Sequence, residues 1–376
     1  MKVAYNATFA RVGGGLSYVT DQIRALTAVA GIDLTVFAGP AGHEQLRTVC
    51  SEVGARFEPV RVPSTGLRFA WEQIVLPWRV RGHEVLVCPG NFCPLFIRTP
   101  TLLILQTSAL VGAGRAHGAG AGKRLRVFLS HRSMISADRL VVISEPLATE
   151  VLSEPGLAHL TPVVVRSGVP AVATPSAGSR AADRATATAV VGPHPYVLSV
   201  AHDYEHKRLG DLGRLAARMG APSPERDGDV SSELRIALVG DISERRQAEI
   251  RSTAGPGADR LVFVGVVTDA DVVRALYASA AVAVTTSALE AWNFTIHEAS
   301  SQGTPLVATD LPIHQELGGD HVHYYPVGDV DALAAATNAA AIAPRPDPWV
   351  PDWTWQRHGT ELAALIRDLA GTGGER

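Results

Sequence analysis

A strand–loop–helix–strand unit in the last third of the sequence constrains the fold more than any other stretch. The apolar, partly β-branched run Ala281–Thr285 predicts a buried strand, and the polar and aromatic residues 286–293 predict a loop at its end. Helical spacing begins at about Phe294 and stops at Gly303-Thr304-Pro305, because glycine and proline end helices. Leu306-Val307-Ala308 predicts the next strand. Such units build parallel sheets, whose ligands bind at the carboxyl ends of the strands.

Two carboxylates bracket this turn. Glu290 lies in the predicted loop and Glu298 in the predicted helix, so they would lie about 12 Å apart along a helix axis and reach different parts of one long ligand. Asn293, Phe294 and Thr295 open the helix, where unpaired N–H groups and a partial positive charge favour an anion or a sugar hydroxyl. The alternative is that both glutamates are solvated acids at helix ends.

The first half of the sequence begins with a similar unit. Lys2–Tyr5 predicts a strand, residues 11–15 form a glycine loop, and helical spacing follows from Leu16. At Gly14 and Gly15 a ligand could approach the backbone closely, and the helix start favours phosphate, although a plain turn also explains the glycines. Further strands and helices then alternate, which predicts a parallel sheet.

A second series of strand–helix units starts at Tyr196–Val200, after a stretch rich in Ala, Ser, Thr, Pro and Gly that has linker composition. We therefore expect an α/β protein with two Rossmann-like, doubly wound domains. The expected division is residues 1–170, a linker over 171–189, a second domain over 190–345, and a C-terminal segment over 346–376 that carries a final helix.

Three motifs, in this order along the chain, resemble those of retaining glycosyltransferases of family 4. The glycine loop followed by Tyr18 is similar to the family's GG-x-x-x-Y opening, and Lys207 stands at the head of a helix like the family's phosphate-binding lysine. Glu290 and Glu298, with seven residues between them and followed by ASSQGTPLVATD, resemble the family's glutamate-x7-glutamate signature. The resemblance implies the GT-B fold, in which two Rossmann-like domains face each other across a cleft and the terminal helix crosses back to the first domain.

The resemblance also implies roles for residues. Glu290 would contact hydroxyls of the donor sugar, the backbone of Asn293, Phe294 and Thr295 would hold that sugar, and Glu298 would bind the ribose. Lys207 would neutralise the donor diphosphate, with Arg208 sharing the charge.

Gly14 and Gly15 would face the donor phosphates and the acceptor. The sequence departs from the family pattern at Gln106, which replaces histidine near the reacting sugar, at His202, which replaces arginine, at Ala291 and Asn293, which replace glycines, and at Thr295, which replaces proline.

The implied activity is a retaining, metal-independent transfer of a sugar from a nucleotide diphosphate sugar to an acceptor, without a cofactor. The acceptor would be a glycan, a lipid-linked glycan or a small-molecule natural product. Asp269 and Asp271 are interpreted as a helix cap and its first turn, not as a metal site. Two alternatives stay open: a nucleotide-sugar 2-epimerase of the same fold, and a nucleotide-sugar-binding protein without catalytic activity.

Composition indicates where in the cell the protein is expected to act. The 376 residues are 46% hydrophobic without a run long enough to span a membrane, and the sequence start predicts a strand, which favours a cytoplasmic protein. Lys123–Arg139 mixes basic and apolar residues, so it would lie either on an anionic membrane, at its inner face, or on the protein as a solvated surface helix. No nucleic-acid partner is expected. Three cysteines without metal-ligand spacing predict buried or idle thiols and no disulfide framework: Cys50, Cys88 and Cys93.

Overall fold

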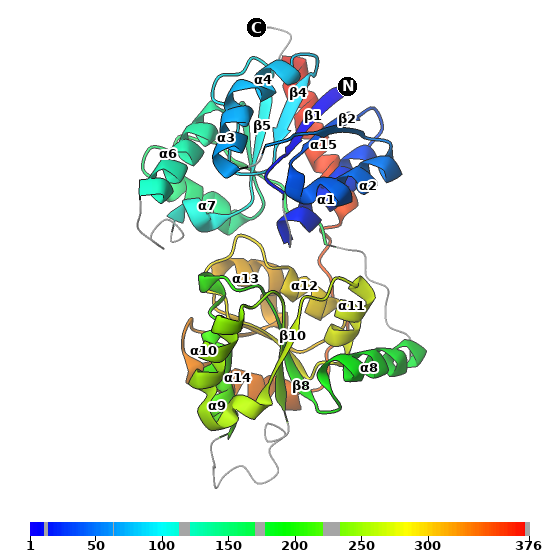
Figure 1. The fold of residues 1–376 in the computed structure, drawn as a ribbon, viewed down its shortest axis with the longest axis vertical. Coiled ribbons are helices and arrows are strands. Elements are labelled where there is room, and N and C mark those ends of the chain that lie inside the picture. Colours follow the sequence, from blue (N-terminus) through cyan, green and yellow to red (C-terminus); the bar gives the residue numbers. More distant parts are fainter. Residues whose placement is uncertain (11–13, 63, 113–120, 170–176, 221–233, 373–376) are drawn as a thin grey trace. The chain divides into compact units, whose positions relative to one another are not determined.

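Two parallel sheets, each in its own unit of the chain, organise the structure (Figure 1). Unit 1 contains Met1–Pro170 and Asp352–Arg376, and unit 2 contains Ala171–Pro351. The structure is a computed structural model that describes the chain apart from residues 11–13, 63, 113–120, 170–176, 221–233 and 373–376.

Unit 1 holds a seven-stranded parallel sheet in the order β3-β2-β1-β4-β5-β6-β7. Its inner strands are buried along their length, which explains why VLVC and TLLIL are continuous apolar runs. The strands are β1 (Lys2–Ala7), β2 (Asp33–Ala38), β3 (Arg56–Pro59), β4 (Val85–Cys88), β5 (Thr101–Leu105), β6 (Arg139–Val142) and β7 (Val163–Val164). The helices are α1 (Gly14–Thr27), α2 (His43–Val53), α3 (Thr65–Ile74), α4 (Leu76–Arg79), α6 (Ala121–Ser136), α7 (Glu145–Ser153) and α15 (Trp355–Thr372).

The C-terminal helix α15 completes unit 1 by packing on α1. The two backbones approach so closely that a Cβ at Gly359 would lie 2.5 Å from the carbonyl oxygen of Ala25. The Trp355 ring meets Tyr18 edge to face at 5.5 Å. The final helix expected within residues 346–376 therefore exists, as Trp355–Thr372.

A buried polar network joins the same two helices. Gln22 accepts a hydrogen bond from the Tyr5 hydroxyl at 2.6 Å and donates from Nε2 to the Tyr18 hydroxyl at 2.9 Å. The amide nitrogen also lies 2.7 Å from His358 Nε2, which must accept, so Nδ1 carries the proton and donates to the carbonyl oxygen of Arg166 at 2.8 Å. Burial lowers the pKa of His358 to about 4, which keeps the ring neutral.

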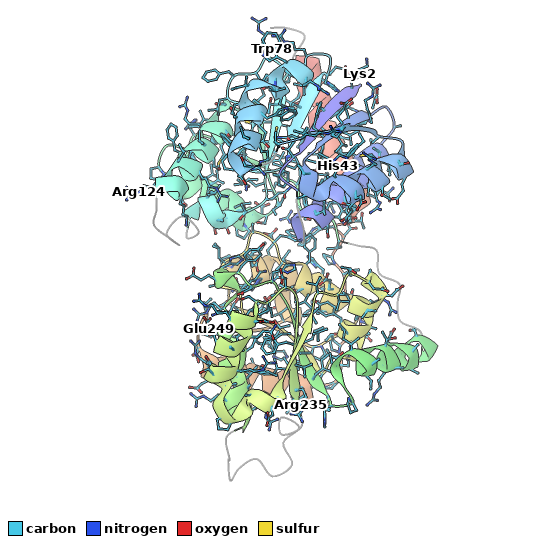
Figure 2. All side chains as sticks on the ribbon, in the orientation of Figure 1. Lys2, His43, Trp78, Arg124, Arg235 and Glu249 are labelled. Carbon is cyan, nitrogen blue, oxygen red and sulfur yellow. The ribbon has the colours of Figure 1, made fainter. Side chains whose placement is uncertain are left out.

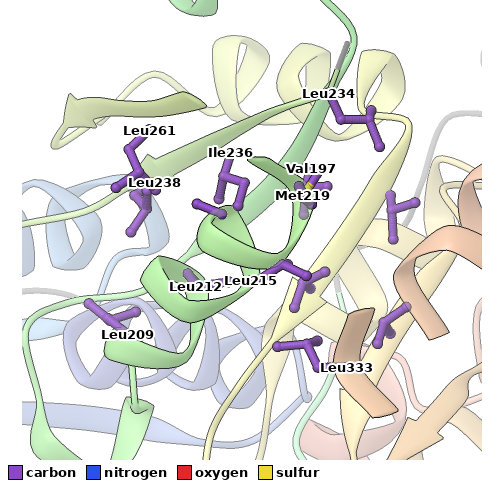
Figure 3. Packing of buried hydrophobic residues seen from close by; sticks show 14 of the residues in the cluster. Val197, Leu209, Leu212, Leu215, Met219, Leu234, Ile236, Leu238, Leu261 and Leu333 are labelled. Atoms are coloured by element: carbon purple, nitrogen blue, oxygen red, sulfur yellow. The ribbon is translucent and has the colours of Figure 1, made fainter. Parts of the chain in front are cut away.

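Unit 2 holds a six-stranded parallel sheet in the order β10-β9-β8-β11-β12-β13. Leucine, isoleucine and valine side chains from its strands and from α9 and α14 form the core shown in Figure 3. The strands are β8 (Tyr196–Val200), β9 (Arg235–Val239), β10 (Leu261–Gly265), β11 (Val282–Thr285), β12 (Leu306–Thr309) and β13 (His323–Tyr325). The helices are α8 (Ala177–Val191), α9 (Gly210–Gly220), α10 (Glu244–Ala254), α11 (Ala270–Ser279), α12 (Phe294–Ser301), α13 (Pro312–Gly318) and α14 (Val330–Ile342).

In each sheet the strand order reverses once, between β1 and β4 in unit 1 and between β8 and β11 in unit 2. Loops diverge at such a point, and the crevice at the carboxyl ends of the two strands is where doubly wound sheets bind ligands. The expected α/β class with two Rossmann-like halves is confirmed.

The expected linker over residues 171–189 is wrong in its second part, where Ala177–Val191 form α8. The alanine-rich composition suits a helix as well as a linker, and packing on α11 decides between them. Arg274 of α11 donates two hydrogen bonds, at 2.8 and 2.9 Å, to the buried carboxylate of Asp183. Two other expectations are confirmed: Asp269 caps α11, and all three cysteines are buried and free.

No helix in the described part of the chain is long and apolar enough to cross a membrane.

Candidate functional site

The point of reversal in unit 2 carries an ion pair between two predicted site residues. Lys207 ends the short 3-10 helix Glu205–Lys207, in the loop after β8, and Glu290 lies in the loop after β11. Lys207 Nζ lies 2.5 Å from Glu290 Oε1, and the two side chains are 21% and 9% exposed. Residues 83 positions apart in the sequence thus meet where the fold places a ligand.

The backbone holds the two loops in this register. The Thr286 hydroxyl donates to the carbonyl oxygen of Lys207 at 2.6 Å, and the Ala288 N–H donates to the carbonyl oxygen of His206 at 2.7 Å. Neither bond involves the charged groups. One bond from the Thr286 side chain and one from the main chain thus link the two loops in addition to the ion pair.

The conformation of Asn293 explains why this position does not need the glycine that the family 4 motif has there. Its backbone is extended (φ −135°), so no left-handed conformation is required. Its Oδ1 accepts from the Thr295 N–H at 3.1 Å and so caps α12, while Nδ2 donates to the Thr285 hydroxyl and to His314 Nε2, both at 3.0 Å. The Thr295 N–H, predicted to hold the donor sugar, is thus already used within the protein. Phe294 is the first residue of α12.

His314, on α13, stabilises this turn by a hydrogen bond to Asn293, a role that no pattern in the sequence indicates. The buried ring donates from Nδ1 to the carbonyl oxygen of Thr309 at 2.8 Å, which leaves Nε2 to accept from Asn293. Burial lowers the pKa of His314, so the ring stays neutral. A proton on Nε2 would face the Asn293 amide protons, and the cap of α12 would lose its support.

Glu298 lies on α12 and is half-buried. Burial raises its pKa, and the buried Tyr277 hydroxyl beside it opposes the shift, although no hydrogen bond of ordinary geometry joins the two groups. Among the described residues, no hydrogen bond or ion pair joins Glu298 to Lys207 or Glu290.

Arg208 and His202 do not reach the Lys207–Glu290 pair. Arg208 has a left-handed backbone (φ 48°), and its Nε donates to Asp211 Oδ2 of α9 at 2.8 Å. A Cβ at Gly328 would lie 2.8 Å from its guanidinium, so the glycine makes room for this arginine. His202 accepts at Nδ1 from the Asp241 N–H at 3.1 Å, which leaves Nε2 to carry the proton in the neutral ring.

The remaining predicted residues lie in unit 1. Helix α1 begins at Gly14, and Gly15 is exposed with open space around its α-carbon, while residues 11–13 of the glycine loop lie outside the described residues. Gln106 follows β5, and its N–H donates to Asn91 Oδ1 at 3.2 Å. Its Nε2 atom is buried without a hydrogen-bond partner among the residues that the structure describes.

A carboxylate that sequence reasoning missed lies at the point of reversal of unit 1. Glu72 of α3 is 4% exposed and accepts at Oε1 from the Thr8 hydroxyl at 2.5 Å and from Asn6 Nδ2 at 3.4 Å, at the end of β1. Arg68 Nε lies 3.6 Å from the same oxygen. Burial raises the pKa of Glu72 against these contacts. A helix-face glutamate looks solvated in the sequence, because nothing local shows that it faces a strand end.

The described residues contain no group of three or more histidine, cysteine, aspartate or glutamate side chains that could hold a metal ion. A positively charged group is nevertheless present at the ligand edge of unit 2, in the form of Lys207.

Part of the chain matches a known protein family. Residues 221–341 match the family described as glycosyl transferases group 1. No match to the chain was found among curated protein sequences.

Solved structures resemble the whole chain. HepE of Anabaena in complex with UDP and glucose has 17% identity and a TM-score of 0.68, and the match covers 100% of this chain and 98% of HepE. Sucrose-phosphate synthase of Thermosynechococcus elongatus has 18% identity and a TM-score of 0.73 over 99% of this chain and 100% of the synthase. WaaG, a glycosyltransferase involved in lipopolysaccharide biosynthesis, has 16% identity and a TM-score of 0.65 over 98% of each chain. The chain has the GT-B fold.

Proposed function

We propose that this protein is a retaining glycosyltransferase that moves a sugar from a nucleotide diphosphate sugar to an acceptor. The observation that carries the proposal is the Lys207–Glu290 ion pair at the carboxyl ends of β8 and β11. It places a cation and a carboxylate where a doubly wound sheet binds a nucleotide. The match of residues 221–341 to group 1 glycosyl transferases supports the same activity.

In this proposal the chain acts by positioning and by charge. Lys207 donates one N–H to Glu290, and its ammonium has two further N–H donors for the diphosphate, where it offsets the negative charge that grows as the sugar leaves. A fixed, partly desolvated ammonium does this without reorganisation, which is why it stabilises the transition state more than the bound substrate. The reaction is proposed to be metal-independent, with the Lys207 ammonium in the place of a divalent ion.

The two glutamates hold different ends of the donor. Glu290, next to Lys207, accepts hydrogen bonds from hydroxyls of the sugar, and Glu298, within α12, accepts them from the ribose. The cap that Asn293 forms keeps the loop between them fixed, supported by His314. A fixed loop lowers the entropy lost when the sugar is aligned for transfer.

A UDP-sugar is the first donor to test, because HepE of Anabaena is described in complex with UDP-glucose. For the acceptor we keep the class wide: a glycan, a lipid-linked glycan or a small-molecule natural product. The proposal places the protein in the cytoplasm, with access to the inner face of the membrane.

The test has two steps. A thermal-shift screen with UDP, GDP, ADP and dTDP should show one nucleotide that raises the melting temperature of the wild type and much less that of Lys207→Ala, since ligand binding stabilises by mass action. Hydrolysis of the matching labelled nucleotide sugar without acceptor, and label transfer with one, should follow. A protein that binds a nucleotide but releases no sugar is the inactive binder, and one that returns an epimerised donor is the 2-epimerase.

A further inference from the structure

Helix α6 of unit 1 carries positive charge without any acid. Its sequence AGKRLRVFLSHRSMIS contains no aspartate or glutamate and four cations: Lys123, Arg124, Arg126 and Arg132. Among the described residues, no carboxylate lies within 4 Å of any of the three arginines. Figure 2 shows Arg124 at the outer side of this helix.

One face of α6 is fully explained by packing on unit 1. Val127 joins Phe92 and Leu110 in a small buried cluster, and Met134 is 1% exposed. Ser133 accepts at Oγ from the Cys93 N–H at 3.2 Å. These contacts dock the helix, so the fold requires no further apolar side chains from it.

A second apolar stripe nevertheless faces solvent. Leu125, Phe128 and Ile135 are 57%, 59% and 40% exposed. They are three and seven residues apart, so they lie in one row along the helix. Helix α6 is already docked by another face, so its fold does not explain the exposed leucine and phenylalanine. Exposed large apolar side chains in a row are typical of a contact surface.

The basic residues flank this stripe on the same helix. We call Leu125, Phe128 and Ile135, together with Arg124, Arg126 and Arg132, the α6 surface.

We propose that the α6 surface binds to the anionic headgroups and outer acyl region of a lipid bilayer. Apolar side chains between arginines suit the membrane interface, where the aliphatic parts enter the acyl boundary and the guanidinium groups stay among lipid phosphates. A second copy of the chain would set α6 cations against α6 cations, which opposes dimerisation through this surface. The inference goes beyond the proposed transfer reaction, because membrane binding requires neither donor nor catalysis.

The test is co-sedimentation of the full chain with vesicles of pure phosphatidylcholine and with vesicles in which part of it is replaced by phosphatidylglycerol. We expect binding to the second kind only, weakened by added salt. Arg124→Gln/Arg126→Gln should lower the partition coefficient by roughly twentyfold or more, since each cation near an anionic surface is worth about a factor of five. Leu125→Ser/Phe128→Ser should lower it by about tenfold or more.

The matched control is Arg245→Gln/Ile342→Ser, which removes an arginine that is 89% exposed and an apolar residue that is 69% exposed from unit 2. It should bind like the wild type, and all variants should keep the wild-type melting temperature. Wild-type protein that ignores anionic vesicles would overturn the proposal. Equal binding of the wild type and both α6 variants would also overturn it. If only the arginine variant loses vesicle binding, the protein adsorbs by charge without the apolar stripe, which contradicts the proposal. A dimer in size-exclusion chromatography that the Leu125→Ser/Phe128→Ser variant loses would assign the surface to a second copy instead.

Discussion

Replacing Glu290 by Gln should strengthen the binding of a free nucleoside diphosphate while it slows sugar transfer. Lys207 Nζ lies 2.5 Å from Glu290 Oε1 in the structure, so a diphosphate that approaches the ammonium also approaches a carboxylate of its own sign. Gln keeps the size and shape of the side chain but carries no charge. The variant therefore leaves Lys207 to the ligand.

The gain can be sized from the geometry. A phosphate oxygen on the far side of the ammonium would lie about 6 Å from the carboxylate, and two like charges at that distance repel by about 3 kcal/mol at an effective dielectric constant of about 20. Lys207 and Glu290 keep 21% and 9% exposure, so solvent screens part of this repulsion. We expect a net gain of about 1 kcal/mol, which lowers the Kd about fivefold. Transfer should suffer in the opposite direction, with kcat falling about a hundredfold if the carboxylate is worth ~3 kcal/mol to the transition state.

Calorimetric titration of UDP, or of whichever nucleotide the thermal screen selects, measures the first effect, and steady-state kinetics measure the second. The matched control is Glu205→Gln, which removes the same charge from an exposed position in the loop after β8, two residues before Lys207. An unchanged or larger Kd in Glu290→Gln would refute the reasoning, because Glu290 would then not compete for Lys207. An equal gain in the control would attribute the effect to net charge alone.

Three further predictions concern single residues. Lys207→Ala should lower kcat/KM for the donor by about ten- to a hundredfold, the value of a charge-assisted contact of roughly 1.5–3 kcal/mol, and an unchanged kcat/KM would place the phosphate contact elsewhere. Glu298→Ala should raise the donor KM more than it lowers kcat, because ribose contacts are equal in substrate and transition state; a pure kcat defect in steady-state kinetics would contradict that role. His358 has a folded pKa lowered to about 4, so the unfolded chain takes up the proton first as the pH falls below about 6.5, and about 3 kcal/mol of stability is lost between there and pH 4. Urea unfolding at both pH values should show a smaller loss in His358→Gln; an equal loss would mean that the ring does not stay neutral in the fold.

Local patterns in the sequence were enough to predict the strands and helices around the site. The loop after β11, the start of α12 at Phe294 and the Asp269 cap follow from apolar period and capping chemistry, and the structure confirms them. The prediction of a linker is wrong from Ala177 on. Composition alone cannot distinguish an alanine-rich helix from a linker, and the contact that stabilises this helix joins Asp183 to Arg274, 91 residues away.

What the sequence could not provide was long-range pairing. Sequence motifs identify Lys207 and Glu290 separately as site residues. Their contact depends on β8 and β11 being neighbours, which only the strand order establishes. No motif in the sequence identifies His314 or Glu72 as a site residue. Each is buried by an element far away in the chain, and neither is marked by its sequence neighbours.

Unit 1 is assembled from two stretches of chain with the whole of unit 2 between them. On the ribosome, Gln22 is therefore made 336 residues before His358, the residue with which it shares a hydrogen bond. Unit 2 is continuous and can fold as soon as residues up to 351 have emerged, since domains generally fold as units during synthesis. Unit 1, in contrast, keeps the face of α1 uncovered until α15 has also emerged, so the stretch that starts unit 1 is made before unit 2 and the unit is completed after it.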